Sequence, residues 1–228
     1  HTGRWPHEGV SFAGKRVGII GTGSSAIQSV PWIAEEADRL YVFQRTPNYS
    51  VPARNAPLDP AIRNRVKARY PALRAEAKKR RSGILFPETN LCALAVAPAE
   101  RRRQFDEYWE TGGLAFLSAF VDLLVDKAAN DTAADFIREK IAAIVKDPQT
   151  AEALAPDSVV GCKRLCADSG YFEAFNRPNV TLVDIRDGGI EEITPAGVVA
   201  KGKSFDLDML VFATGFDAMT GALREIDI

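Results

Sequence analysis

A glycine-containing turn near the start of the chain limits most strongly what this sequence can fold into. Residues 21–26 read Gly-Thr-Gly-Ser-Ser-Ala, which fits the pattern G-x-G-x-x-G/A. The largely apolar segment 15–20 before it is typical of a buried parallel strand. After it, apolar residues recur every three or four positions, which predicts a helix that ends near Asp38, with Pro31 near its first turn or at a kink. Strand, glycine turn and helix in this order are the context that a dinucleotide-binding motif requires.

The rest of the chain extends this unit into an α/β fold. Residues 40–43 predict a second strand, so the three elements form a βαβ unit with a right-handed crossover and a parallel sheet. Further strands are expected at 180–185, 190–194, 198–200 and 209–213, with a hairpin turn at 195–197.

Helical periodicity dominates between these two strand-rich regions. The clearest helix is expected at 131–146, where Asp131 or Thr132 can cap the start and Asp147-Pro148 ends it. We therefore predict a single Rossmann-like, dinucleotide-binding domain over 1–228. Its sheet parts span about 15–50 and 157–215, and a helical insertion spans about 58–155.

Each position of the glycine turn has a physical role in nucleotide binding. Gly21 permits the tight turn, Gly23 lets a pyrophosphate approach the backbone, and Ala26 allows the helix to pack closely on the sheet. The anion would then lie at the helix N-terminus. The alternative is a glycine turn in an α/β domain that binds no ligand.

The residues after the second strand indicate which dinucleotide is bound. An NAD site places an acidic residue there to bind the ribose hydroxyls, whereas this chain has Gln44-Arg45-Thr46. Arg45 can pair with a 2′-phosphate and Thr46 can add a hydroxyl donor. NADPH is therefore favoured over NADH, and the alternative for Arg45 is a surface arginine before Pro47.

Charge and composition argue against several other classes of protein. The 228 residues carry 29 Lys and Arg against 30 Asp and Glu, a formal net charge of -1, so a general nucleic-acid binder is not the default expectation. Nine basic residues lie between Arg63 and Arg81, which we interpret as a solvated helix face. No apolar run approaches the roughly 20 residues of a membrane span, and no signal peptide is recognised.

The few cysteines are typical of a cytoplasmic protein, and the few histidines give no indication of a metal site. The three cysteines, Cys92, Cys162 and Cys166, are expected to be free thiols in a reducing compartment. Cys162 and Cys166 have C-x-x-x-C spacing, which differs from the C-x-x-C of dithiol redox motifs. With only His1 and His7, neither a metal cluster nor a Ser-His-Asp triad is expected.

Several motifs in a fixed order carry a resemblance to one enzyme family. They are His1-x-x-x-Trp5-Pro6, the segment from Gly21 to Gln28, Phe43 to Asn48, Cys162-Lys163-Arg164, Phe175 to Val180, and Ala213 to Asp217. The chain resembles, over essentially all of its length, the NADPH-binding domain of Baeyer–Villiger monooxygenases, close to the phenylacetone monooxygenase type.

The resemblance implies a set of site residues and a reaction. The implied cofactor contacts are Gly21, Thr22, Gly23, Ser24, Ser25, Ala26, Ile27 and Gln28 for the pyrophosphate, Arg45 and Thr46 for the 2′-phosphate, and Lys163 for a further phosphate contact. Arg164 is similar to the active-site arginine that lies near the flavin and stabilises its peroxide anion. The implied full-length parent uses NADPH, FAD and O2 to convert ketones to esters or lactones.

The family pattern also implies that this chain is part of a longer protein. The fingerprint F-x-G-x-x-x-H-x-x-x-W-P/D is matched only from His1 onward, and the FAD-binding glycine motif expected upstream does not occur in the sequence. We expect the chain alone to bind the nucleotide without completing the reaction, with the FAD domain of the same parent as its partner. A related flavin monooxygenase that oxidises nitrogen or sulfur, and a non-catalytic NADP-binding module, are the alternatives.

Overall fold

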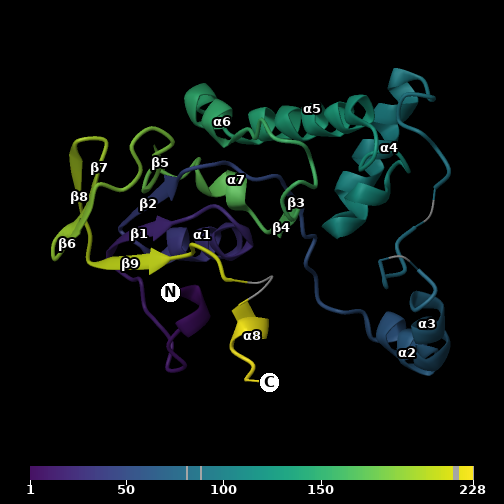
Figure 1. Cartoon of the computed structure of the whole chain (residues 1–228), viewed down its shortest axis with the longest axis horizontal. Coiled ribbons are helices and arrows are strands. Elements are labelled where there is room, and N and C mark those ends of the chain that lie inside the picture. The colour runs from purple at the N-terminus through teal and green to yellow at the C-terminus, as the bar shows by residue number, and fades with distance from the viewer. Residues whose placement is uncertain (81, 88, 218–220, 228) are drawn as a thin grey trace.

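A four-stranded parallel sheet forms the centre of the computed structural model, which describes residues 1–80, 82–87, 89–217 and 221–227. The strand order is β5-β2-β1-β9, and each neighbouring pair is parallel. The strands are β1 (Arg16–Ile20), β2 (Arg39–Gln44), β5 (Val180–Asp184) and β9 (Met209–Phe212). Figure 1 shows these strands side by side, with helix α1 (Ser24–Glu36) against the sheet. The predicted α/β fold with a parallel sheet is confirmed.

The local elements around the glycine turn lie close to where the sequence places them. Helix α1 begins directly after the turn and buries one face, with Ala26, Ile27 and Val30 fully inaccessible. Its end is two residues earlier than expected, and Pro31 lies inside the helix rather than in its first turn. Proline removes one backbone hydrogen bond at that position, which packing against the sheet compensates.

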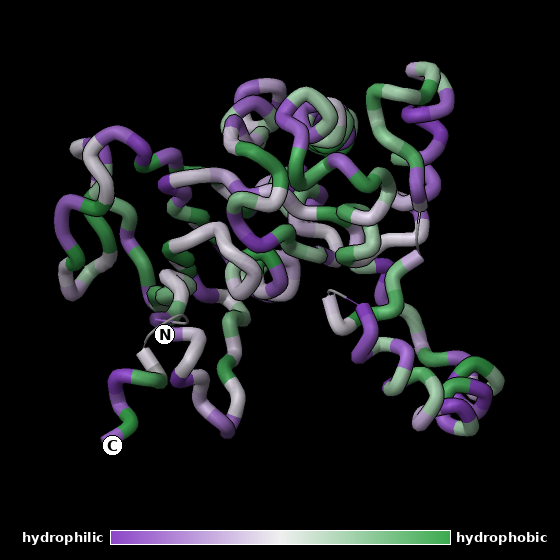
Figure 2. Tube along the Cα trace, turned by 45° about the vertical axis from the view of Figure 1, so that its right-hand side comes forward, coloured by the Kyte–Doolittle hydropathy of each residue, from purple (hydrophilic) through white to green (hydrophobic). Residues whose placement is uncertain are grey.

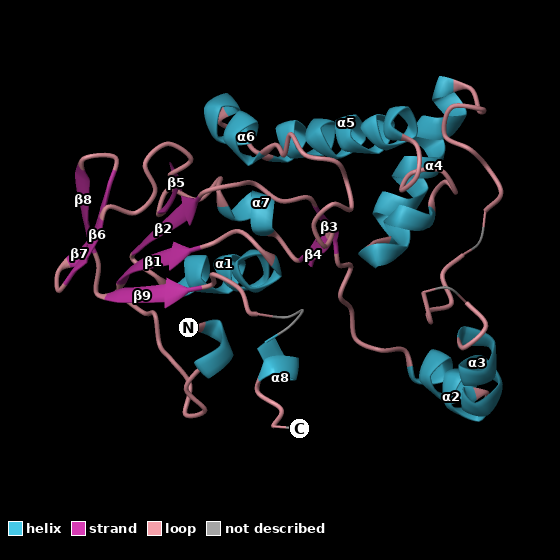
Figure 3. Cartoon of the chain, in the orientation of Figure 1, coloured by secondary structure: helices cyan, strands magenta, loops and turns pink. Residues whose placement is uncertain are grey.

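Two smaller sheets flank the parallel one (Figure 3). Strands β6 (Glu192–Thr194), β7 (Gly197–Ala200) and β8 (Lys203–Asp206) form an antiparallel meander, which confirms the predicted hairpin. Phe205 of β8 packs edge-on against Tyr41 and Phe43 of β2, with ring centroids 5.1 and 5.3 Å apart. The meander therefore covers part of the parallel sheet.

The second small sheet was not expected from the sequence. Strands β3 (Ser50–Pro52) and β4 (Cys166–Asp168) pair in parallel although more than 100 residues separate them. Each has only three residues, too few to show an alternating pattern. The pair is important for the site because it brings residue 166 beside helix α1, which packs on β4.

Between β3 and β4 the described residues form helices. They are α2 (Pro60–Ala68), α3 (Tyr70–Ala77), α4 (Pro98–Thr111), the 3-10 helix η2 (Gly113–Ser118), α5 (Lys127–Ile144) and α6 (Pro148–Leu154). The remaining helices are η1 (Thr2–Arg4), α7 (Tyr171–Ala174) and α8 (Gly221–Arg224).

The predicted cap of the longest helix is wrong. Helix α5 begins at Lys127, and the Asp126 side chain accepts a hydrogen bond from the Ala129 backbone N–H, so Asp131 and Thr132 lie inside the helix. The sequence misled because Asn130, Asp131 and Thr132 are all residue types that can cap a helix. In the structure Ala129 and Asn130 are buried within α5, so the helix begins about one turn earlier. Asp147 ends no helix directly; it caps α6 by accepting from the Thr150 N–H.

Helices α2 and α3 lie apart from the sheet, at the lower right of Figure 1. Neither buries a residue, and hydrophobic and hydrophilic positions are interleaved along them (Figure 2). By contrast, the main buried cluster joins sheet residues such as Val17 and Val42 with Phe105 of α4 and Phe136 of α5. Helices α4 and α5 therefore share one core with the parallel sheet.

Candidate functional site

A cavity of about 590 Å³ opens at the carboxyl ends of β1, β2 and β9. Strand β1 lies between β2, to which α1 connects it, and β9, which returns from the end of the chain, so the cavity lies at the switch point of the sheet. Ligands of open α/β sheets bind at such a point. The lining residues are Ile20, Gly21, Thr22, Gly23, Phe43, Arg45, Thr46, Asn48, Lys163, Ile185, Gly189, Ile190, Ala213, Thr214 and Gly215.

The two glycines of the turn differ in what surrounds them. Gly21 has φ +116°, and a Cβ placed on it would lie 2.3 Å from the Ala213 carbonyl oxygen. Gly23 has φ -88° and no heavy atom within 4 Å of such a Cβ. The fold therefore requires glycine at 21, whereas at 23 the absent side chain leaves open space beside the cavity. That space fits the close approach of a pyrophosphate to the backbone.

The first turn of α1 provides an anion-binding end. No side chain caps it, and Gly23 is the residue that precedes the helix. The first N–H groups of a helix have no partner within the helix, and together with the helix dipole they favour negative charge. The residues present thus fit a dinucleotide phosphate at this end of the cavity.

Side-chain contacts join the glycine turn to the loop that follows β2. The Thr22 hydroxyl, largely buried, donates a 2.6 Å hydrogen bond to the Thr46 carbonyl. This bond fixes the backbone of the residue next to Arg45. The exposed Arg45 side chain lies at the same cavity, as does exposed Lys163 from the loop before β4.

The two cations that line the cavity, and Arg164 next to Lys163 in the chain, lack carboxylate partners in the described part of the structure. Among the residues that the structure describes, no hydrogen bond or ion pair satisfies the side chains of Arg45, Lys163 or Arg164. By contrast, the Arg16 guanidinium forms an ion pair with the Asp208 carboxylate at 2.8 Å. Unpaired positive charges around a cavity with a helix N-terminus favour a ligand that carries several negative charges.

The structure does not bring every candidate residue to this cavity. Ser25 and Gln28 line a separate hollow of about 380 Å³ beside Trp5 and Trp32. Ala26 and Ile27 lie on the buried face of α1 and are fully inaccessible. Arg164 is exposed in the loop before β4 and does not line the cavity.

The hydroxyl of Ser24, which is not among the lining residues of the cavity, contacts a buried sulfur atom. It lies 3.2 Å from the Sγ atom of Cys166, which is buried on β4. Burial raises the pKa of the Cys166 thiol, while the contact with Ser24 lowers it in part, so the sulfur is a neutral thiol at neutral pH.

Sequence reasoning missed the apolar wall and one polar residue of the cavity. Phe43, Ile185 and Ile190 give it a hydrophobic side, which suits an aromatic base. Asn48 lines it as well and contacts Cys166. Asn48 stands three positions after Arg45, and only the fold shows that the loop keeps it at the cavity.

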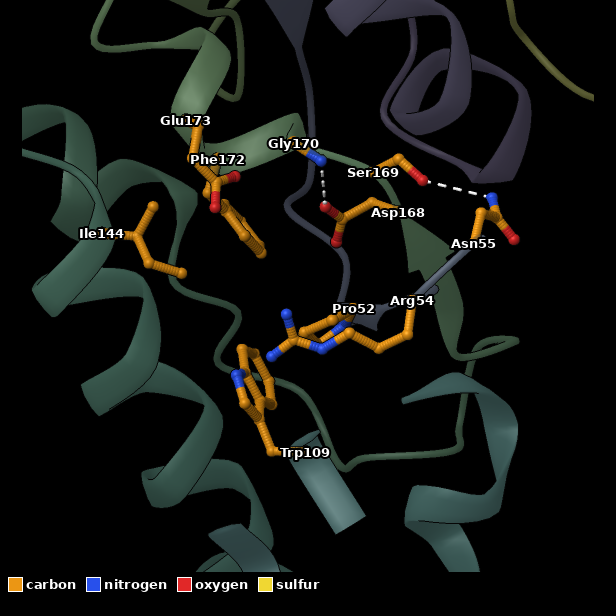
Figure 4. Close-up of a pocket in the computed structure, with 10 residues that line it drawn as sticks. All are labelled: Pro52, Arg54, Asn55, Trp109, Ile144, Asp168, Ser169, Gly170, Phe172 and Glu173. Carbon is orange, nitrogen blue, oxygen red and sulfur yellow. Dashed lines mark hydrogen bonds between the residues drawn. The ribbon is translucent and has the colours of Figure 1, made fainter. Parts of the chain in front are cut away.

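A second cavity of about 470 Å³ lies between β3, β4, α4 and α7 (Figure 4). One of its two carboxylates, that of Asp168, accepts hydrogen bonds from the Ser50 hydroxyl and from the N–H groups of Gly170 and Tyr171, so it holds the start of α7. The Arg54 side chain extends toward Trp109 in Figure 4 and pairs with Glu110 at 2.7 Å. Because Asp168 and Arg54 already have partners within the protein, this cavity is the weaker candidate for a site, although Glu173 lines it as well.

Other kinds of site find little support in the described part of the chain. There, no group of three or more His, Cys, Asp or Glu side chains could hold a metal ion. All three cysteines are free. In the same residues, no helix combines the length and apolar character that crossing a membrane requires.

Known proteins match the chain along its whole length. A 2-oxo-Δ3-4,5,5-trimethylcyclopentenylacetyl-CoA monooxygenase from Pseudomonas putida is 42% identical over 236 residues, covering 100% of this chain and 43% of that protein. A Baeyer–Villiger monooxygenase from Pseudooceanicola batsensis is 42% identical over 231 residues, again covering 100% of this chain and 42% of the relative. The chain thus spans less than half the length of these relatives. No family model matches it.

Solved structures agree with these relatives. Steroid monooxygenase bound to NADP superposes with a TM-score of 0.93 at 53% identity, covering 98% of this chain and 43% of that one. OTEMO in complex with FAD and NADP gives a TM-score of 0.96 at 41% identity, covering 100% of this chain and 44% of that one. The chain is a homologue of the Baeyer–Villiger monooxygenases and corresponds to about 43% of their length.

Proposed function

We propose that this chain is the NADPH-binding part of an FAD-dependent Baeyer–Villiger monooxygenase, whose parent inserts one oxygen atom of O2 into ketones to give esters or lactones. The observation that carries the proposal is the cavity at the switch point, where an uncapped helix start meets two cations that have no partner among the described residues. Relatives that share the whole chain are monooxygenases, and solved neighbours bind NADP and FAD. In domain terms, we propose one NADPH-binding domain with a helical insertion at about 58–155, joined to an FAD domain in the same parent.

The residues at the cavity divide the work of holding the nucleotide. The backbone at Gly21, Thr22 and Gly23 and the start of α1 bind the pyrophosphate through N–H groups. Arg45 and Thr46 hold the 2′-phosphate and Lys163 makes a further phosphate contact, because a guanidinium and an ammonium can each donate charge-assisted hydrogen bonds to a phosphate. The apolar wall receives the base and excludes water from it. When bound, NADPH supplies the hydride that reduces the flavin.

The preference for NADPH over NADH tests this proposal in the chain itself. Calorimetric titration should show tighter binding of NADPH, and Arg45→Ala should weaken NADPH by about 1.5–3 kcal/mol while leaving NADH nearly unchanged. Arg63→Ala is the matched control, because it removes the same charge from exposed helix α2. Equal affinities of the wild type for both nucleotides would refute the assignment of Arg45.

Arg164 has a separate proposed role as an electrostatic stabiliser beside the flavin of the parent. Two features support it: its motif matches the family's basic pair, and its guanidinium has no partner among the described residues. A guanidinium keeps its charge at working pH and donates to an anion that develops nearby.

The full-length parent carrying Arg164→Ala tests that role. Ester formation should fall by about 100- to 1000-fold, whereas nucleotide binding and flavin reduction should change far less. Stopped-flow absorbance separates flavin reduction from product formation. Ester production within a few-fold of wild type would identify Arg164 as an ordinary surface charge.

We also propose that the parent acts in the cytoplasm. Its support is the set of three free cysteines, which suits a reducing compartment. Fractionation of cells that express the parent would test this, and recovery of the protein in a secreted fraction would contradict it.

A further inference from the structure

Three segments that carry the proposed phosphate contacts meet at one sulfur atom. They are the start of α1, the loop after β2, and the loop that leads from Lys163 into β4. We propose that Cys166 is a positioning residue for the nucleotide, whose thiol fixes these three segments relative to one another. This inference rests on the proposed function and adds a residue that the glycine motif and the basic residues do not include.

The Cys166 sulfur has polar contacts with all three segments. Its Sγ lies 3.2 Å from the Ser24 hydroxyl and 3.2 Å from the Asn48 side-chain nitrogen. It also lies 3.5 Å from the Arg164 carbonyl oxygen, to which Asn48 donates as well. The side-chain nitrogen of Asn48 can only donate, so the sulfur accepts there. With its single proton directed to the Arg164 carbonyl, the thiol accepts from Ser24 and Asn48.

Each partner stands beside a residue that faces the nucleotide. Ser24 follows Gly23 and opens α1, and Asn48 lies in the loop that carries Arg45 and lines the cavity itself. The Arg164 carbonyl belongs to the residue after Lys163. The sulfur therefore sets the distance between the pyrophosphate end and the cationic end of the cavity.

Burial makes this junction difficult to replace by water. Cys166 is 2% exposed, whereas Cys92 and Cys162 are exposed. A buried donor or acceptor that loses its partner suffers the cost of desolvation without compensation. Fixing the segments before the ligand arrives lowers the ordering cost of binding. Loss of the sulfur should consequently reduce nucleotide affinity as well as stability.

Calorimetric titration of NADP+ with variants of the chain tests the inference. Cys166→Ala should weaken binding about threefold to tenfold, and Cys166→Ser should restore most of the affinity because a hydroxyl can make the same three contacts. Cys92→Ala is the matched cysteine control. Phe105→Leu is the stability control, because Phe105 is buried against Phe116, Phe120 and Phe136 and does not line the cavity.

A double-mutant cycle separates the junction from a direct phosphate contact of Ser24. If Ser24 acts through the sulfur, Ser24→Ala in the Cys166→Ala background should cause no further loss of NADP+ affinity. Amide hydrogen exchange at 22–26 should rise in both single variants and stay unchanged in Phe105→Leu. Additive losses, or wild-type affinity of Cys166→Ala, would overturn the role of Cys166. Failure of the wild type to bind NADP+ would instead overturn the proposed function.

Discussion

The two glycines of the nucleotide-binding turn show how one residue type serves two purposes. Gly21 allows a backbone conformation and a close approach to Ala213 that a side chain would prevent. Gly23 has an ordinary φ and open space around it, so its value lies in what it leaves free for a ligand. The sequence motif alone cannot separate these purposes, because both positions read as glycine.

Alanine should therefore affect stability at position 21 and nucleotide affinity at position 23. Gly21→Ala should lower the free energy of unfolding by about 2 kcal/mol or more, because it strains the backbone and clashes with a carbonyl oxygen. Gly23→Ala should leave that free energy nearly unchanged but weaken NADPH binding by about tenfold or more, equivalent to 1.4 kcal/mol. Urea unfolding and calorimetric titration measure the two quantities. A Gly23→Ala variant with full affinity would show that the pyrophosphate does not approach this residue.

At the scale of secondary structure, an ion pair connects the amino end of β1 to that of β9. The Arg16 guanidinium donates to both oxygens of Asp208, at 2.8 and 3.2 Å, and its backbone N–H donates to Oδ2 at 2.8 Å. These bonds, with the side-chain contact as the largest cause, lower the pKa of Asp208 to about 2. The pair fixes the register of the two strands whose opposite ends form the cavity.

Acid should weaken this connection in a defined pH range. Because the folded-state pKa of Asp208 lies below its usual value of about 3.9, its stabilising effect is present above pH 4 and is lost as the pH falls through about 2. Asp208→Asn should therefore be less stable than wild type at neutral pH, and the difference should shrink below pH 4. Urea unfolding at several pH values checks this. Asp206→Asn, which removes the longer 3.5 Å pair, should show a smaller effect.

Helix α5 is tied to its surroundings by one buried amide. The Asn130 side chain donates to the carbonyls of Leu123 and Val160, at 2.7 and 2.9 Å, and accepts from the Val160 N–H at 2.9 Å. All of its bonds are inaccessible to water, so truncation leaves buried backbone groups without partners.

Asn130→Ala should thus destabilise the chain by about 2–4 kcal/mol, measured by urea unfolding. Asn64→Ala on exposed helix α2 is the control and should change stability by less than about 0.5 kcal/mol. Since Asn130 does not line the nucleotide cavity, NADPH affinity of the folded variant should change much less than its stability. A loss below about 1 kcal/mol would mean that water or a local shift satisfies the freed groups.

In the whole molecule, one core joins the sheet to α4 and α5, while the described residues between 54 and 90 contribute none of their side chains to it. Nine basic residues fall in the part of this segment from Arg63 to Arg81. An exposed segment that buries nothing opens easily and is accessible to proteases.

Trypsin should cleave the chain first in this segment, because it cuts after lysine and arginine. The two fragments should stay together through the shared core and keep NADPH affinity within a few-fold of the intact chain. Mass spectrometry of the earliest products and titration of the nicked protein measure both outcomes. Early cleavage in α5, or separation of the fragments, would contradict this description of the core.

The sequence alone determined the parallel βαβ unit and the antiparallel hairpin, because their patterns are local. Apolar periodicity around a glycine turn, and two short strands around Pro195-Ala196-Gly197, depend only on neighbours in the chain. It also pointed to Gly21, Gly23, Arg45 and Lys163, which the structure places around one cavity. Their binding of the nucleotide stays a prediction.

Only the tertiary structure decided the pairing of β3 with β4, the contacts of Ser24 and the direction of Ser25 and Gln28. Successive residues of a helix point in different directions, so a motif read along α1 mixes positions that face the cavity, the core and the hollow beside Trp5. Ser24 contacts Cys166, which lies 142 positions away, and Asn48 contacts it across 118 positions. Such contacts follow from how the whole chain packs, and no pattern within a short window of sequence records them.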